Sequence, residues 1–312
     1  RFFAHFGKRP TDCFQAERLD PHYRIFFKDG DRVDITGDRT AMRALFEGYE
    51  AGAGAALDRY LERSRQTYER AMPGFVYTDR PRLRDYLTLD VARQARGLSL
   101  LGTMDRFVAR YFRHPKLRQI MEYSLVFLGG APNSTPALYH LMGHVDFNLG
   151  VFYPQGGIGA LVDAVAGLAQ ELGVRVLLNR PATRISRRAE SGLTVDTEEG
   201  PLDADAVVAA ADYHHVETQL LDPADRQYSD GYWRRRVWAP SAFLLYLGIQ
   251  GETPELAHHS LVLPTDWSGH FADLFDDPAW PQDPAYYLCV PSRTDPTVAP
   301  PGHTNLFVLV PG

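Results

Sequence analysis

The spacing of apolar residues predicts a helical first half of the chain. Between residues 40 and 70 helix formers dominate, and Met42, Phe46 and Tyr49 recur at the spacing of one helix face. Pro73 and Gly74 end this segment. Further helices are predicted over residues 88–112, 117–128, 136–149 and 158–172.

Alternating and continuous apolar runs predict strands, most of them in the second half. Residues 23–27 and 32–35 flank Asp29 and Gly30, a signal for a hairpin turn. The run of small apolar residues over 204–211 is typical of a strand buried on both faces. The other strands are expected at residues 174–177, 182–187, 193–197, 202–203, 242–248, 259–263, 286–290 and 305–310, with a helix near 269–275. This mixture predicts a mixed α/β (α+β) fold.

Composition limits the classes of function. The chain has 312 residues, 45% of them hydrophobic, enough to bury a core in two domains or one elaborate domain. Its formal net charge of -6 argues against nucleic-acid binding, which needs an excess of Lys and Arg. Cys13 and Cys289 offer neither a disulfide framework nor a zinc motif, and a reducing cytoplasm is expected. Apolar runs such as 242–249 are too short to cross a bilayer, so any membrane contact is expected to be peripheral.

A basic amphipathic stretch covers residues 98–118. Apolar residues such as Met104 and Phe107 recur there at helical spacing, and arginines surround them in sequence. Two interpretations stay open: a solvated face over a stripe that packs in the core, or a surface that docks on anionic lipid. The run Trp-Arg-Arg-Arg-Val-Trp at 233–238 leaves the same two open.

A glycine-rich turn at residues 156–159 follows a short strand and precedes a helix. Three of its four residues lack a Cβ, so the backbone can adopt positive φ and approach a ligand, and amides of the following helix favour negative charge. An ordinary glycine-rich helix start is the competing interpretation. Small side chains at 209–211, followed by Asp212 as a helix cap, would let a second backbone segment approach the same ligand. The candidate cofactor-binding residues are Pro154, Gly156, Gly157, Ile158, Gly159, Ala182, Ala209, Ala210, Ala211 and Asp212.

Several longer runs resemble the central part of bacterial-type phytoene desaturases, the FAD-dependent carotenoid desaturases of the amine-oxidase-like flavoprotein group. The broader matches are Leu-Gly-Gly-Ala-Pro at 128–132, Gly-Val-Phe-Tyr-Pro-Gln-Gly-Gly at 150–157 and Ala-Asp-Ala-Val-Val at 204–208. The narrower ones are Leu-Ala-His-His at 256–259 and Pro-Ser-Arg-Thr-Asp-Pro at 291–296, followed by Ala-Pro-Pro-Gly at 299–302. The resemblance covers nearly the whole chain.

This resemblance implies part of a Rossmann-like FAD-binding domain at residues 146–218. A substrate domain would comprise a mixed sheet from 1–37 and 219–312 and a helical part at 38–145, which would carry the membrane-facing surface. Complete members carry an N-terminal GxGxxG turn and a C-terminal flavin segment, and neither occurs here. The chain is therefore expected to be the middle of a longer protein with a partial FAD surface, itself inactive.

The activity implied for the parent is FAD-dependent desaturation of a carotenoid such as phytoene. The implied partners are the carotenoid, a membrane surface that the protein binds peripherally from the cytoplasm, and oxygen or a quinone as electron acceptor. Other flavin oxidases of this fold, a carotenoid isomerase and a non-catalytic lipid-binding or interaction module are the alternatives.

Carboxylates that could accept the proton released in such a reaction are few. Asp146, just before the glycine-rich turn, and Asp273, in a predicted helix, are the candidates, although each fits a surface or capping role as well. His140 and His144 stand four residues apart, but with no HExxH glutamate and no third ligand they indicate helix packing, and no metal site is expected.

Overall fold

The computed structural model describes residues 2–89, 91, 93, 98–100, 102–189 and 191–312. The chain packs as two compact units, residues 1–164 together with 240–312, and residues 165–239. These units are defined by packing. They do not test the boundaries of the FAD-binding and substrate domains expected from the resemblance, which stay a prediction.

A six-stranded sheet forms the frame of the first unit. Its order is β3-β2-β9-β10-β11-β8, and β2 runs parallel to β9 while the other pairs are antiparallel. The strands are β2 (Tyr23–Phe27), β3 (Arg32–Ile35), β8 (Ala242–Gln250), β9 (His259–Leu263), β10 (Tyr286–Cys289) and β11 (His303–Pro311). The hairpin predicted between β2 and β3 is confirmed, with Gly30 at φ 89° in its turn.

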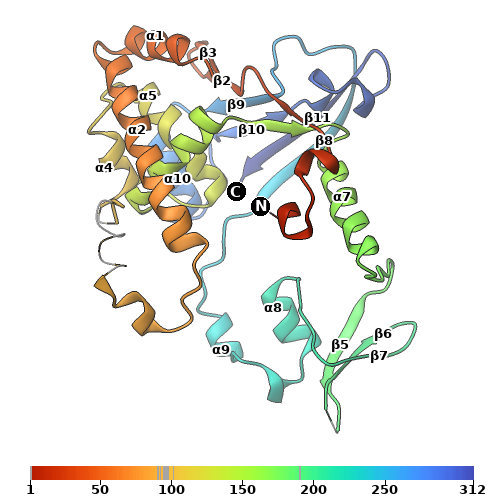
Figure 1. Cartoon of the computed structure of the whole chain (residues 1–312). Helices are drawn as coiled ribbons and strands as arrows, with labels where there is room; N and C mark the ends of the chain where they lie inside the picture. The colour runs from red at the N-terminus through yellow and green to blue at the C-terminus, as the bar shows by residue number, and fades with distance from the viewer. Residues whose placement is uncertain (1, 90, 92, 94–97, 101, 190) are drawn as a thin grey trace. The chain divides into compact units, whose positions relative to one another are not determined.

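Helices gather beside these strands and share one core with them (Figure 1). They are α1 (Arg39–Tyr49), α2 (Ala53–Ala71), α4 (Met104–Val108), α5 (Pro115–Glu122), α6 (Ser124–Leu128) and α10 (Trp267–Phe275). Ile25 and Ile35 from the sheet, Phe46 from α1, and Phe112 between α4 and α5 are fully buried in that core. The helix predicted over 40–70 is interrupted between α1 and α2, where Gly52 has a φ of 83°.

The helix predicted over residues 88–112 is wrong in extent. Only α4 is a helix within 98–112, because Ser99 and Gly102 both have positive φ; residues 90, 92, 94–97 and 101 lie outside the described residues. Met104 and Phe107 are buried in the core, which favours the core-packing interpretation of this stretch. Its exposed basic side chains include Arg106, Arg110 and Arg113.

Residues 136–149, predicted as one helix, form two short turns of different kinds. Residues 137–141 make a 3-10 helix, and His144–Leu149 make a π-helical turn. Gly143 joins them against Tyr60, whose Cε1 would lie 2.9 Å from a Cβ at that position. This close approach leaves room only for glycine at that position. The remaining short helical segments are Phe3–Phe6, Pro10–Asp12, Met72–Val76, Leu83–Tyr86, Val216–Leu220, Pro223–Asp225, Pro291–Arg293 and Pro296–Val298.

The element expected around the glycine-rich turn is present. β4 (Phe152–Pro154) pairs with β1 (Ala16–Arg18) in a two-stranded antiparallel sheet, and α7 (Ile158–Glu171) follows the turn. Gly173, at φ 81°, lies just beyond the helix, and the next N–H, of Val174, donates to the carbonyl of Ala169. The helix begins in the first unit and ends in the second.

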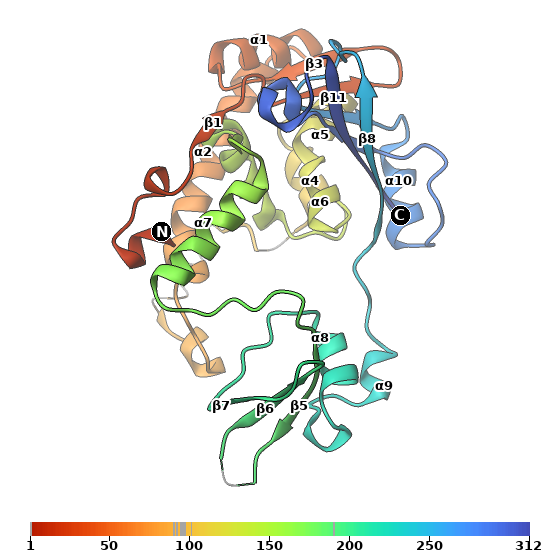
Figure 2. The same ribbon diagram turned by 90° about the vertical axis from the view of Figure 1, so that its right-hand side faces the viewer.

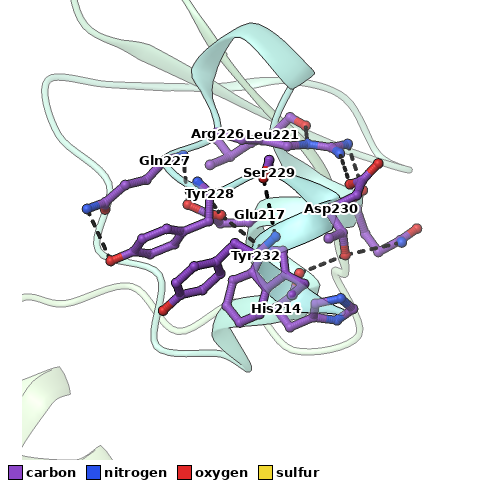
Figure 3. Close-up of polar contacts among 12 residues, drawn as sticks. His214, Glu217, Leu221, Arg226, Gln227, Tyr228, Ser229, Asp230 and Tyr232 are labelled. Carbon is purple, nitrogen blue, oxygen red and sulfur yellow. Dashed lines mark hydrogen bonds and ion pairs between the residues drawn. The ribbon is translucent and has the colours of Figure 1, made fainter. Parts of the chain in front are cut away.

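The second unit contains a small antiparallel sheet, β5 (Ala182–Arg187), β6 (Leu193–Thr197) and β7 (Leu202–Ala204), beside the short helices α8 (Tyr213–His215) and α9 (Asp230–Trp233) (Figure 2). Nearby, the buried Glu217 carboxylate accepts hydrogen bonds from the amides of Gln227 and Tyr228 (Figure 3). It also accepts hydrogen bonds from the side chains of Tyr213 and Trp233. Burial opposes its ionisation, but these bonds outweigh that effect and hold its pKa below the usual value.

Two strands predicted in this unit do not form. Residues 174–177 have no strand structure, and the run 204–211 is a strand only at its first residue, with Val208 93% exposed. A strand needs a neighbour for its N–H and C=O groups, and apart from Ala204, the last residue of β7, these segments pair with none of the described strands. The run of small apolar residues therefore does not form a strand buried on both faces.

We expect the loss of a large side chain from the core of the first unit to lower the free energy of unfolding strongly. Leu57 on α2 is fully buried, whereas Leu83 is 80% exposed. We expect Leu57→Ala to lower the free energy of unfolding by about 2–5 kcal/mol, because contacts are lost and the surroundings collapse only partly. Leu83→Ala, the matched control, should change it by less than about 0.5 kcal/mol. Urea unfolding of both variants tests this, and equal effects would contradict the core described above.

Candidate functional site

The glycine-rich turn presents open backbone at the start of α7. Gly156 and Gly157 have φ values of 84° and 82°, which favour glycine. A Cβ on Gly159 would meet nothing within 4 Å, and one on Gly157 would have the Tyr153 hydroxyl, at 3.7 Å, as its nearest neighbour. The amides of the first turn of a helix have no acceptor inside the helix. An anionic or carbonyl-bearing ligand can therefore approach this backbone closely.

The buried carboxylate of Asp295 accepts a hydrogen bond from the backbone of this turn. Asp295 is 1% exposed, and its Oδ2 accepts from the Gly156 amide at 2.7 Å and from the Tyr153 hydroxyl at 3.3 Å. Its Oδ1 accepts from the amide and hydroxyl of Thr297 at 2.9 and 2.6 Å. The bonds from Thr297 and Gly156 hold the pKa of Asp295 below its usual range, so it is a carboxylate at neutral pH.

A row of aromatic rings leads away from the turn. The ring centroids of Tyr153 and His258 lie 4.6 Å apart, those of His258 and His259 4.5 Å, and those of His259 and Tyr287 5.7 Å. Hydroxyls fix both imidazoles, since Nδ1 of His258 is 2.7 Å from Oγ1 of Thr294 and Nδ1 of His259 is 2.6 Å from the Tyr287 hydroxyl. Burial lowers their pKa values to about 4 and about 3, which leaves both rings neutral.

An apolar cavity of about 460 Å³ lies at the far end of this row. His259 and Tyr287 contribute to its wall, and Asp146 carries the only carboxylate among the described residues that line it. The apolar part of its wall includes Phe127, Leu128, Met142, Val145, Leu261 and Leu309. The cavity can hold a hydrocarbon, with one acidic group within its lining.

The environment of Asp146 makes it a weaker acid than an ordinary aspartate. Its Oδ2 accepts from the Tyr23 hydroxyl at 2.6 Å and from the Tyr123 hydroxyl at 3.1 Å, and it sits on the π-helical turn after His144. Burial raises the pKa of Asp146 to about 6, and the two hydrogen bonds act in the opposite direction. The group can thus change its charge near neutral pH.

The sequence-predicted site residues are divided between the two units. Pro154, Gly156, Gly157, Ile158 and Gly159 lie together in the first unit, whereas Ala182, Ala209, Ala210, Ala211 and Asp212 lie in the second. Ala182 begins β5, and Ala209, Ala210 and Ala211 are exposed in the segment that was expected to be a strand. Asp212 is confirmed as a helix cap, because it accepts from the His215 amide at 2.8 Å. The cofactor role of all ten stays a prediction.

The two candidate acids differ in position. Asp146 lines the cavity, whereas Asp273 lies on α10 and is not among the described residues that do so. The catalytic role of either residue stays a prediction, and the described geometry favours Asp146.

Two groups of side chains in the first unit contain potential metal ligands. Both ring nitrogens of His140 face hydroxyls of α2, those of Ser64 and Thr67, at 3.0 and 3.3 Å. Ligand atoms of His258, His259 and Cys289 lie within 4.8 Å of one another. Burial raises the pKa of the Cys289 thiol, which disfavours the thiolate that a metal requires, and we assign no metal there.

Sequence reasoning missed the residues that connect the turn to the cavity. Asp295, His258 and His259 belong to runs that carried the family resemblance, but they had no assigned role. Tyr23 lies on the first predicted hairpin, and Tyr123 on the helical segment after residue 117. The two runs were a usable signal for the first three, whereas nothing in the sequence places the two tyrosines against Asp146.

Comparison with known proteins identifies the family of this chain. The model of a family described as flavin containing amine oxidoreductase matches residues 12–312. The chain is 58% identical to a carotenoid 3,4-desaturase of Haloarcula japonica over 100% of its own length and 63% of the relative's. It is 34% identical to a zeta-carotene-forming phytoene desaturase of Myxococcus xanthus over 99% of its own length and 59% of the relative's. The chain thus spans about 60% of the length of these relatives.

Solved structures share the fold. A protein of Pyrococcus furiosus has a TM-score of 0.55 at 12% identity, covering 99% of this chain and 63% of that one. At this level of identity the likeness concerns the fold alone, which is mixed α/β as expected.

The titration of Asp146 offers a direct check of the cavity. Replacing Tyr23 by Phe removes a donor to the ionised carboxylate, so the pKa of Asp146 should rise above about 6. Tyr123→Phe, which removes the longer hydrogen bond, should give a smaller rise. Carbon-detected NMR titration of the labelled carboxyl carbon measures both. An unchanged or lowered pKa in Tyr23→Phe would show that the described contact is absent.

Proposed function

The chain belongs to the flavin containing amine oxidoreductase family, and from this premise we propose that, at full length, the protein uses FAD to desaturate a carotenoid such as phytoene. The observation that carries the proposal is the apolar cavity with one titratable carboxylate, connected by packed rings to the open glycine-rich turn. The names of the two curated relatives support the choice of a carotenoid.

The residues of the turn fit the flavin cofactor. Gly157 and Gly159 leave room for a bulky ring or phosphate against the main chain, and α7 begins at Ile158, at the helix end that favours negative charge. Pro154 ends β4 before the turn, and Ile158 is the exposed first residue of α7 after it. When bound, FAD supplies the acceptor for the hydride that leaves the hydrocarbon.

Residues of this chain would accept the proton that the substrate releases. Desaturation removes two hydrogens from neighbouring carbons, one with its electron pair and one as a proton. With a pKa of about 6, Asp146 is largely ionised at pH 7 and can accept that proton. Burial and the nearby carboxylate raise the pKa of Tyr23, so its hydroxyl remains a donor to Asp146 and holds it in place.

The cavity would select and orient the substrate. A polyene has no hydrogen-bonding groups, and the apolar side chains of the wall, such as Phe127 and Leu309, need no hydrogen-bond partner. Neutral His259 adds ring surface without charge. Oxygen or a quinone would take the electrons from the reduced cofactor, and nucleic acid has no part in this function.

The proposal is tested by producing the full-length protein in a host that accumulates phytoene. We expect a purified yellow protein and products with additional conjugated double bonds, seen by chromatography and mass spectrometry. Asp146→Asn should lower kcat about 100-fold or more, because the base is lost. In the wild type kcat/KM should fall as the pH drops through about 6, when Asp146 becomes protonated.

Asp273→Asn is the matched control and should keep both the activity and the pH profile. A colourless protein, or products that differ from phytoene only in double-bond geometry, would refute desaturation. The second result would indicate an isomerase instead.

We further propose that the protein works at the cytoplasmic surface of a membrane, where carotenoids dissolve. No helix among the described residues is long and apolar enough to span a bilayer. The surface that we favour is the segment 80–89, in which Leu83, Leu87 and Leu89 are 80, 79 and 79% exposed. Arginines at positions 82 and 84 are exposed beside them and suit anionic lipid. The stretch 98–118 offers exposed arginines, but apart from Leu100 most of its apolar side chains are buried and cannot insert.

Flotation of the full-length protein with vesicles of mixed zwitterionic and anionic lipid separates these surfaces. Changing Leu83, Leu87 and Leu89 together to Glu should reduce the floated fraction several-fold, because apolar insertion is lost. Changing Arg106, Arg110 and Arg113 to Glu should have a smaller effect. If the leucine variant floats like the wild type, the segment 80–89 is not the docking surface.

A further inference from the structure

We propose that Asp295 is the positioning residue for the flavin-binding turn, and that the loop carrying it also sets the first ring between that turn and the cavity. This inference rests on the proposed function, since it concerns the turn to which FAD is assigned. Asp295 would not touch the reacting atoms. It would act through the backbone of Gly156.

The geometry gives Asp295 no freedom to move. Four hydrogen bonds converge on its two oxygens, from the Gly156 amide, the Tyr153 hydroxyl and both donors of Thr297. The side chain is 1% exposed, so water does not replace a donor that is lost. The carboxylate thereby ties the strand β4, the turn and the loop after residue 294 into one rigid piece.

The turn is closed by the bond from the Gly157 amide to the Pro154 carbonyl, and the bond from the Gly156 amide to Asp295 attaches it to the loop after residue 294. Gly156 has a positive φ, and its N–H donates to Asp295 in the loop after residue 294. This bond fixes the backbone conformation in which the turn is open to a ligand. The neighbouring Gln155 is held by its amide to the Gln15 carbonyl and by its side chain to Glu17. The contact with Glu17 is exposed and therefore weaker.

Thr294, the residue before Asp295, orients the first imidazole ring between the glycine-rich turn and the cavity. Thr294 holds Nδ1 of His258 at 2.7 Å, and the His258 ring packs on Tyr153. Adjacent residues of one loop thus orient both the cofactor turn and the first ring of the row that leads to the cavity. The loop therefore determines the position of the glycine-rich turn relative to His258, the first imidazole on the way to the cavity.

The experiment compares full-length Asp295→Asn with Glu17→Gln. An Asn side chain can present its oxygen either to Gly156 or to Thr297, but not to both with a full set of acceptors. We expect the dissociation constant for FAD, measured by equilibrium dialysis, to rise about tenfold or more, as for loss of one charge-assisted hydrogen bond. The visible flavin band should also change shape. Glu17→Gln should stay within about twofold of the wild type for both readouts.

Thr297→Val provides a second reading if Asp295→Asn does not fold. It removes one donor to Asp295 and keeps the bond to Gly156, so a smaller rise in the same direction is expected. Circular dichroism confirms folding of each variant. An FAD affinity within twofold of the wild type in folded Asp295→Asn, or in Thr297→Val when Asp295→Asn is unfolded, overturns the positioning role. A wild type that binds no FAD refutes the proposed function itself, and the two failures are thereby distinguished.

Discussion

The parallel pairing of β2 with β9 is the constraint on which the described site depends. It joins the beginning of the chain to its last third, with Ile25 opposite Leu261. Because this register is fixed, Tyr23 at the start of β2 and His259 at the start of β9 line the same apolar cavity. The pairing of β1 with β4 makes a second connection of this kind and places the glycine-rich turn after β4. The helices then bury the sheet and supply Asp146 and Tyr123.

Two carboxylates of the first unit show how environment alone separates the roles of identical side chains. Asp295 receives four donors and its pKa is lowered, so it is a fixed negative charge suited to holding a backbone amide. Asp146 receives two hydroxyls inside an apolar cavity, and burial raises its pKa to about 6. A group that titrates near neutral pH suits proton transfer, and a group that does not titrate there suits structure.

The second unit shows what a short piece of sheet can stabilise. Its core is small, with Ile185, Val216 and Leu220 buried together, and the Glu217 carboxylate organises the aromatic side chains beside it. The small-residue run at 204–211 stays largely exposed, because a strand is held by neighbours and the described strands offer it none. The chain spans about 60% of the length of its curated relatives, and the cofactor assignments in this unit stay predictions.

The sequence by itself determined the features that depend on near neighbours. The β2–β3 hairpin follows from Asp29-Gly30, the end of α7 from Gly173, and the cap of α8 from Asp212, since each is decided by the conformational preference of one or two residues. The family resemblance also came from contiguous runs. Only the tertiary structure decided that Asp146 meets Tyr23 and Tyr123 and that Asp295 holds Gly156. These contacts join residues far apart in the chain, and no local pattern records which distant donor a buried carboxylate will find.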